Sequence, residues 1–167
     1  MRLNLKEIIH VPGGSLPFDF ELDFSQIEFH GERPAQAPVH VVGRVRNVAD
    51  ALLLEGEAVT TLSLVCDRCL KPFETEKAVL LDTLLATELE HEESESDIYL
   101  LDGDEVDLDE LVREAFILDM DTKHLCSENC KGLCSGCGVD LNHEECRCKP
   151  EVDPRLASLA KQLEDKD

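Results

Sequence analysis

The chain has 167 residues, of which 43% are hydrophobic, and its 37 acidic and 16 basic side chains give a formal charge of −21. This length suits one domain with a hydrophobic core and a small appendage. The sequence has no run of about 18 apolar residues, which excludes a membrane-spanning helix, and residues 1–7 lack the apolar stretch of a signal peptide. We therefore expect a cytoplasmic protein with reduced cysteines. The acidity also argues against binding free nucleic acid through a broad basic surface.

The first part of the chain has the alternation that is typical of β-strands. Residues 18–24 alternate apolar and acidic side chains without a break, which is the period of a half-buried strand. Val39, Val41 and Val45 repeat this period, and Gly43 between them indicates a bulge.

Two hairpins are predicted next. Residues 52–57 and 59–65 are expected to pair as the first one. A further strand from residue 73 to about residue 85 is expected to pair with the strand that ends at residue 65. This pairing leaves Cys66 and Cys69 at the tip of an antiparallel hairpin.

An acidic segment follows the strands. Between Lys77 and Arg113 the sequence has 13 carboxylates and no Lys or Arg, so this window holds −13 of the total charge. Residues from about 86 to 106 show no regular period and are expected to form an acidic loop. Such a charge suits a basic partner, for example a ribosomal protein, whereas the alternative explanation is solubility alone.

One clear helix is predicted at about residues 107–118. Asp107 suits its N-cap, and Glu110 three residues later completes a capping box. Apolar side chains then recur at helical spacing and share one face, at positions 108, 111, 112, 115 and 116.

Together these elements predict an α+β fold with three parts. Residues 1–123 are expected to form an antiparallel β-rich domain, either a barrel or a curved sheet, with one main helix. Residues 124–150 have too few large apolar side chains to form a core, so this cysteine-rich segment is expected to fold around zinc. Residues 151–167, with Pro154 at a first helical position, predict a short terminal helix.

The eight cysteines form four close pairs, which are Cys66 and Cys69, Cys126 and Cys130, Cys134 and Cys137, and Cys146 and Cys148. Zinc takes four soft ligands in a tetrahedron, and two thiolates on a tight turn supply half of a site. Four half-sites therefore predict two zinc ions. We expect the first two pairs to share one ion, and the last two pairs to share the other.

Several alternatives stay open at this point. One zinc ion could be held by Cys66, Cys69, Cys134 and Cys137 alone, with the other four cysteines free. A four-thiolate shell also suits an iron–sulfur cluster. Some pairs could be redox dithiols or small buried side chains. His124 is an alternative ligand in place of Cys126.

The sequence gives no support for catalysis, and we expect that the protein is not an enzyme. Its histidines and carboxylates form no catalytic-zinc motif, and it has neither a phosphate-binding glycine loop nor a nucleophile elbow. Arg44, Arg46, Arg68 and Lys71 are candidate contacts to RNA or to a protein partner. The alternative is ordinary surface charge that balances neighbouring acids.

Two strings of residues carry a resemblance to a known family. They are Cys66-Asp67-Arg68-Cys69-Leu70-Lys71-Pro72-Phe73 and Cys130-Lys131-Gly132-Leu133-Cys134, the latter continued by Cys137-Gly138 and Asp140-Leu141-Asn142. With the β-rich first half, the acidic loop, the helix and Asp153-Pro154-Arg155-Leu156, they resemble the YceD family of large ribosomal RNA subunit accumulation proteins.

The resemblance implies a ribosome-assembly factor that supports accumulation or processing of large-subunit (23S) ribosomal RNA. Such a factor would bind a pre-ribosomal RNA or a ribosomal protein and would have no enzymatic activity. The alternative is a metal- or thiol-dependent enzyme, or a redox switch, in the same RNA pathway.

Overall fold

The computed structural model describes residues 1–29, 31–49, 51–87 and 98–148. Its main sheet consists, in spatial order, of β2 (Ser15–Leu22), β3 (Val39–Val48), β4 (Ala51–Val65), β5 (Pro72–Ala86) and β6 (Ile98–Leu100). Neighbours from β2 to β5 are antiparallel, and β6 is parallel to β5. A second, two-stranded ribbon pairs β1 (Arg2–Asn4) with β7 (Glu105–Asp107), which leads into helix α1 (Leu108–Leu118).

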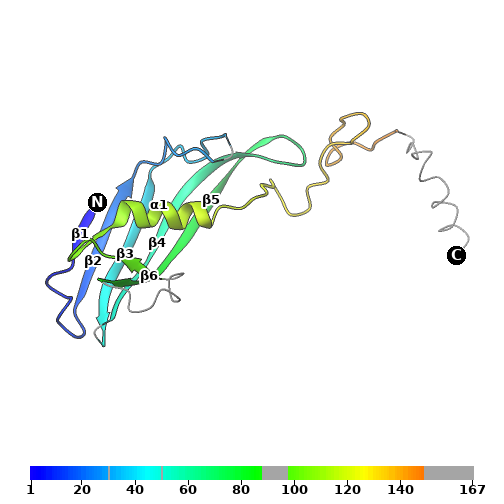
Figure 1. Ribbon diagram of the computed structural model, residues 1–167. Coiled ribbons are helices and arrows are strands. Elements are labelled where there is room, and N and C mark those ends of the chain that lie inside the picture. The colour runs from blue at the N-terminus through cyan, green and yellow to red at the C-terminus, as the bar shows by residue number, and fades with distance from the viewer. Residues whose placement is uncertain (30, 50, 88–97, 149–167) are drawn as a thin grey trace, which may run out of the picture.

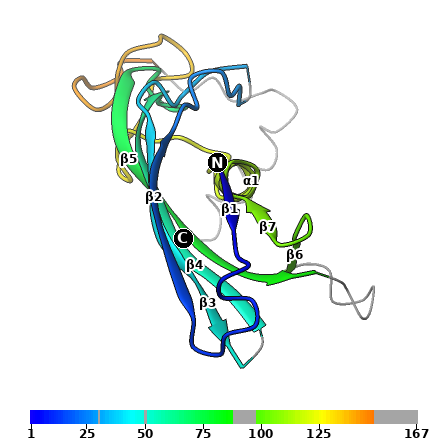
Figure 2. The same cartoon turned by 90° about the vertical axis from the view of Figure 1, so that its left-hand side faces the viewer.

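The main sheet is strongly curved, and α1 lies on its concave side together with the β1–β7 ribbon (Figures 1 and 2). Among the described strands, β2 and β6 are the two edges of the sheet and do not pair with each other. The α+β prediction with one main helix is therefore confirmed, and the barrel alternative is wrong. The helix and the ribbon fill the space that closure of a barrel would need.

The core lies between the concave face of the sheet and α1. Alternate residues of β3 and β4 are buried, except at the half-buried Gly43 and Gly56, as in a sheet with one face exposed to solvent. From the helix, Leu108 and Val112 are fully buried, and the Phe116 ring meets the Phe24 ring edge-on at 5.3 Å. Such edge-to-face pairs are a favoured arrangement of aromatic rings.

The helix begins as the sequence predicts. The Asp107 carboxylate accepts hydrogen bonds from the backbone N–H groups of Asp109 and Glu110 and so caps the first turn. At the other end, Lys77 of β5 donates to the Asp119 backbone carbonyl at 2.6 Å and pairs with its carboxylate at 2.7 Å. A cation at the C-terminal end of a helix also interacts favourably with the helix dipole. Lys77 therefore fixes the end of α1 to the sheet.

Two strand predictions were wrong. Residues 52–57 and 59–65 do not form a hairpin, because both belong to the continuous strand β4. Gly43 is no bulge either, since it pairs in register with Phe18 on one side and Gly56 on the other. A Cβ atom at Gly43 would lie 2.5 Å from Phe18 Cζ and 2.7 Å from the Gly56 Cα. Both glycines therefore make room for the Phe18 ring and for close approach of the strands.

The expected acidic loop contains more regular structure than its composition indicates. Residues 98–100 form β6 and residues 105–107 form β7, because distant strands offer them pairing partners. The remainder of that prediction at residues 88–97 lies outside the described residues, as does the predicted terminal helix at residues 151–167. No helix in the described part of the chain is long and apolar enough to cross a membrane.

A Gly43→Ala substitution tests the close packing around Phe18. We expect it to lower the free energy of unfolding by about 1–3 kcal/mol, because the new methyl group overlaps the Phe18 ring and the backbone of β4. Urea denaturation of the purified protein measures this difference. Thr61→Ala, at an exposed position of β4, is the control and should change stability by less than about 0.5 kcal/mol. Equal stability of Gly43→Ala and the wild type would contradict this packing.

Candidate metal centres

The first cysteine cluster begins at the tip of the β4–β5 hairpin, as predicted. The strands pair as far as Val65 and Pro72, and the Cys66 N–H then donates to the Lys71 carbonyl at 2.9 Å. Leu70 closes this knuckle with an N–H···O bond of 2.8 Å to Cys66 and adopts a left-handed φ of 55°. This turn places the sulfurs of Cys66 and Cys69 in one group.

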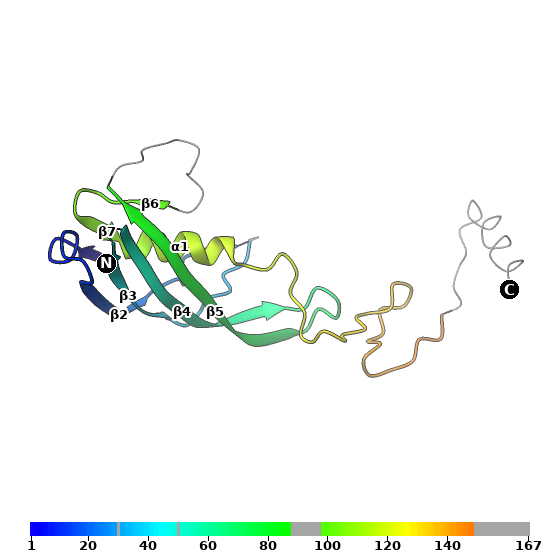
Figure 3. The same ribbon diagram turned by 90° about the horizontal axis from the view of Figure 1, so that it is seen from below.

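The second half of this cluster comes from the segment after α1, which runs beside the hairpin to its tip (Figures 1 and 3). The Asp67 N–H donates to the His124 carbonyl at 2.9 Å, and the His124 N–H donates to the Asp67 carboxylate at 2.6 Å. These two hydrogen bonds hold the two segments together. The Arg68 guanidinium donates to the Cys130 carbonyl at 2.7 Å. These contacts bring Cys126 and Cys130 to the hairpin tip.

The sulfur geometry of the first cluster is compact. The Sγ atoms of Cys66 and Cys130 lie 3.8 Å apart, and those of Cys69 and Cys126 lie 3.7 Å apart. All four sulfurs lie within 4.8 Å of one another. Three of these cysteines are buried, and Cys126 is exposed.

The second cluster is built entirely within residues 134–148. Gly138, with a φ of 73°, donates its N–H to the Cys134 carbonyl at 2.8 Å and closes a knuckle that contains Cys134 and Cys137. Cys146 lies between them, with its Sγ 3.1 Å from Cys134 Sγ and 3.8 Å from Cys137 Sγ. With Cys148, the four sulfurs again lie within 4.8 Å of one another. Here Cys137 and Cys148 are exposed, so this cluster is the more accessible one.

Both clusters have the donor set of a tetrahedral metal site, and three of the four sulfur–sulfur distances described above match its dimensions, the exception being Cys134 to Cys146 at 3.1 Å. With metal–sulfur bonds of about 2.3 Å, the sulfurs of a tetrahedron lie about 3.8 Å apart. Disulfide sulfurs would lie about 2.0 Å apart, and all eight cysteines, which lie in the described ranges, are free thiols. The two clusters could therefore each hold a metal ion, and their membership is that of the two-site prediction.

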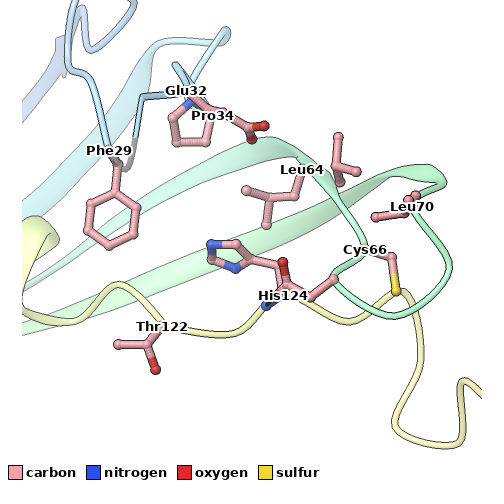
Figure 4. Close-up of a pocket in the computed structure, with 10 residues that line it drawn as sticks. Phe29, Glu32, Pro34, Leu64, Cys66, Leu70, Thr122 and His124 are labelled. Atoms are coloured by element: carbon pink, nitrogen blue, oxygen red, sulfur yellow. Dashed lines mark hydrogen bonds between the residues drawn. The ribbon is translucent and has the colours of Figure 1, made fainter. Parts of the chain in front are cut away.

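His124 lies outside both clusters. Its ring points toward Phe29 and away from the Cys66 sulfur (Figure 4), and the two ring centroids lie 6.5 Å apart. Cys126 takes the position in the cluster that His124 was considered for.

Hydrogen bonds favour one thiolate in each cluster. The backbone N–H of Cys126, followed by those of Cys69 and Arg68, lowers the pKa of Cys66 to about 6. In the second cluster, a hydrogen bond from the Cys146 thiol and then the amides of Cys137 and Gly136 lower the pKa of Cys134 to about 6. Each cluster therefore offers an anionic sulfur near neutral pH, and binding of a cation would displace the remaining protons.

Two residues that sequence reasoning did not assign to the site connect the clusters. Asp140 pairs with Lys71 of the hairpin tip at 2.7 Å, and this ammonium, followed by the Asn142 amide N–H, lowers the pKa of Asp140 to about 2. The Asn142 side chain donates to Asp140 at 2.8 Å and to the Cys130 sulfur at 3.4 Å. Their only sequence signal is the Asp140-Leu141-Asn142 string that contributes to the family resemblance.

Residues 131–133 form the short link between the two clusters, and position 132 of this link requires glycine. Leu133 donates its N–H to the Arg68 carbonyl at 2.9 Å, so the link packs directly on the hairpin tip. Gly132 has a φ of 75°, and a Cβ atom there would lie 2.8 Å from the Arg68 carbonyl oxygen. A side chain at this position is therefore disfavoured both by the backbone conformation and by space.

The four candidate cationic contacts do not form one patch. Arg44 and Arg46 lie on β3, and both pair with Glu55 of β4. Arg68 and Lys71 lie at the hairpin tip, which is about 35 Å further along β4 at the usual rise per residue. Contact of either pair with RNA or a partner stays a prediction.

Comparison with known proteins places the chain in a family. Residues 54–162 match the family described as large ribosomal RNA subunit accumulation protein YceD. This chain belongs to the YceD family. The matched region contains all eight cysteines of this YceD-family chain.

Three relatives share 27–28% sequence identity with the chain. The chain is 27% identical over 179 residues to the uncharacterized protein YlbN of Bacillus subtilis (strain 168), an alignment that covers 100% of this chain and 99% of YlbN. It is 27% identical to the chloroplastic large ribosomal RNA subunit accumulation protein YCED homolog 1 of Zea mays, covering 95% of this chain and 64% of the relative.

An uncharacterized protein of Mycobacterium tuberculosis (strain ATCC 25618 / H37Rv) is 28% identical over 72% of this chain. The chain spans 59% of the length of that mycobacterial relative. No solved structure matches the chain.

Metal content tests the two-site geometry. We expect the purified protein to hold about two divalent ions per chain, and Cys66→Ser and Cys137→Ser each to lose about one, because each removes one of four ligands. Elemental analysis by mass spectrometry measures these numbers. Ser135→Ala, between two ligands of the second cluster, is the control and should keep both ions. If the two cysteine variants lose the same single ion, the two-site arrangement is wrong.

The two sites should also differ in how readily they lose metal. Because Cys137 and Cys148 are exposed whereas the first cluster is largely buried, we expect a chelator to remove the second ion several times faster. Cys66→Ser isolates the second site and Cys137→Ser isolates the first, so the two release rates can be measured separately with a metallochromic chelator. Equal rates, or faster release from Cys137→Ser, would contradict this order.

Proposed function

We propose that this protein is a non-enzymatic cytoplasmic factor that supports accumulation of large-subunit (23S) ribosomal RNA, with two structural zinc ions that hold its partner-binding end in shape. Membership of the YceD family carries the proposal. The relatives from Zea mays and Arabidopsis thaliana are named as large ribosomal RNA subunit accumulation proteins. The region that matches the family includes both cysteine clusters.

The ligand sets support a structural role for the ions. Four thiolates fill a tetrahedral shell, whereas a catalytic zinc ion keeps one position open for water or substrate. Zinc is also favoured over an iron–sulfur cluster. Sulfurs within 4.8 Å of one another suit a single ion better than a larger cluster of several iron and sulfide atoms.

The charge supports a basic partner. A chain with a formal charge of −21 repels free RNA at long range but attracts basic proteins, and ribosomal proteins of the large subunit are partners of this kind. The protein would then act by holding such a partner, or a particle that contains it, during assembly of the subunit.

One observation favours a second candidate, a thiol-based redox switch in the same pathway. Without metal, a hydrogen bond from the Cys146 thiol lowers the pKa of Cys134 to about 6, and this partly exposed sulfur would be a reactive thiolate. Alkylation of the purified native protein separates the two candidates. Protection of all eight cysteines supports structural zinc, and fast labelling of one pair supports the switch.

Deletion in cells tests the proposal directly. We expect loss of the protein to lower 23S ribosomal RNA relative to 16S RNA, and affinity purification to recover large-subunit precursors. Wild-type protein and Ser135→Ala should restore 23S RNA, whereas a Cys66→Ser/Cys69→Ser double variant should not. In that variant the hairpin tip no longer shares a metal ion with the segment that carries Cys126 and Cys130. Normal 23S RNA after deletion under all growth conditions, together with no recovered precursor, would refute the proposal.

A further inference from the structure

An open pocket of about 360 Å³ lies beside the first cluster (Figure 4). Its walls come from three segments that are distant in the sequence. Phe29 and Pro34 belong to the loop between β2 and β3, Leu64 to the end of β4, and His124 to the segment after α1. This volume is at the lower end of the range for ligand pockets, about 300–1,000 Å³, and suits a short stretch of peptide.

Hydrogen bonds made by residues of the lining join its three walls. The Ser63 N–H donates to the Pro34 carbonyl at 2.9 Å and attaches the loop to β4. The paired hydrogen bonds between Asp67 and His124 attach the third wall to the hairpin tip. Because these contacts are made within the chain itself, an occupant would not have to order the walls.

The chemistry of the lining is apolar with a negative rim. Leu70 is exposed to 64% and Val65 to 39%, so both present apolar surface to solvent at the rim. The rim also carries Glu32 and Asp67, and none of the described residues that line the pocket is Lys or Arg. Cys66 belongs to the first cluster, where four thiolates and one divalent ion would add a net charge of about −2.

The two bases at the hairpin tip do not line the pocket. The Arg68 guanidinium donates to the Cys130 carbonyl, and Lys71 pairs with Asp140 on the second cluster's segment. Both cations are therefore already used to hold the tip together. The lining itself therefore combines an apolar hollow with two carboxylates and no Lys or Arg, and the nearest bases in the sequence, Arg33 and Lys123, adjoin lining residues without lining the pocket.

We propose that this pocket is a docking site for a basic peptide segment of a protein partner, in which an arginine or lysine alternates with a large apolar side chain. The apolar side chain fills the hollow between Phe29, Leu64 and Leu70, and the cation lies between Glu32 and Asp67. This inference rests on the proposed function and specifies how the basic partner is recognised. RNA is the less suitable occupant, because the same carboxylates and the anionic cluster would repel its phosphates.

The test uses the full zinc-loaded chain and a synthetic peptide of alternating arginine and leucine with blocked ends. Fluorescence anisotropy at low salt measures its affinity, and NMR of the labelled protein locates the contact. We expect amide shifts at Phe29, Leu64 and His124. Matched peptides with glutamate in place of arginine, or serine in place of leucine, and an oligouridylate RNA are the competing probes.

Charge variants test whether the peptide binds to the carboxylates of this pocket or to the acidic surface of the chain in general. Glu32→Gln with Asp67→Asn keeps the hydrogen-bond acceptor to His124 but removes both charges. We expect about threefold to tenfold weaker peptide binding. The single variant Glu32→Gln avoids the His124 contact and should show a smaller loss. Glu74→Gln, an acidic position of β5 outside the pocket, is the control and should bind as the wild type does.

Leu70→Asn tests the apolar part, because asparagine tolerates the left-handed backbone at this position. It should weaken the arginine–leucine peptide severalfold, whereas Leu80→Asn, an exposed position of β5 outside the pocket, should not.

The docking proposal is overturned by any of four results. These are no peptide binding, equal binding to the variants and the wild type, amide shifts confined to other acidic regions, or tighter binding of the RNA at the pocket. These results are independent of 23S RNA levels. Failure of the docking site alone leaves the deletion phenotype in place. Failure of the proposed function appears as normal 23S RNA after deletion, whatever the peptide does.

Discussion

The sulfurs of Cys66 and Cys130 lie 3.8 Å apart, although 64 positions separate them in the chain. The structure around the hairpin tip depends on this closure. Residues 124–148 have few large side chains to bury, so hydrophobic packing alone cannot hold them in a fixed arrangement. A metal ion shared by the hairpin and this segment would close a long loop and remove much of its conformational freedom. Arg68, Asp67 and Lys71 then fix the orientation of the segment through direct polar contacts.

Local chemistry explains what the sequence could predict. Asp107 and the apolar face that follows it define α1 without help from distant residues, and the cysteine pairs define the half-sites. The continuity of β4 was not predictable, because Gly56 looks like a turn until Gly43 and the Phe18 ring are known to lie beside it. The β1–β7 pairing was missed for a similar reason, since residues 105–107 become a strand only when residues 2–4 lie next to them. Asp140 carries no distinctive local signal, and its role depends on Lys71.

The cations at the tip illustrate a second limit of sequence reasoning. Arg68 and Lys71 resemble surface contacts for a nucleic acid in the sequence, yet their side chains bind the backbone of Cys130 and the carboxylate of Asp140. Arg44 and Arg46 pair with Glu55 in the same way. The few basic residues in these regions hold segments together, and much of the acidic surface stays uncompensated. These cations make their contacts within the chain although their side chains are partly exposed, and the acidic side chains outnumber them.

The contact between Lys77 and the end of α1 has a mechanical consequence. From Asp119 to Cys126 the chain can extend to at most about 25 Å. Along β5, the distance from Lys77 to Pro72 is already about 17 Å, and the turn to Cys69 follows. The segment therefore has little spare length between its two anchors. A displacement of the helix away from the tip would therefore pull on the sulfur atoms there, which couples the core of the domain to its far end.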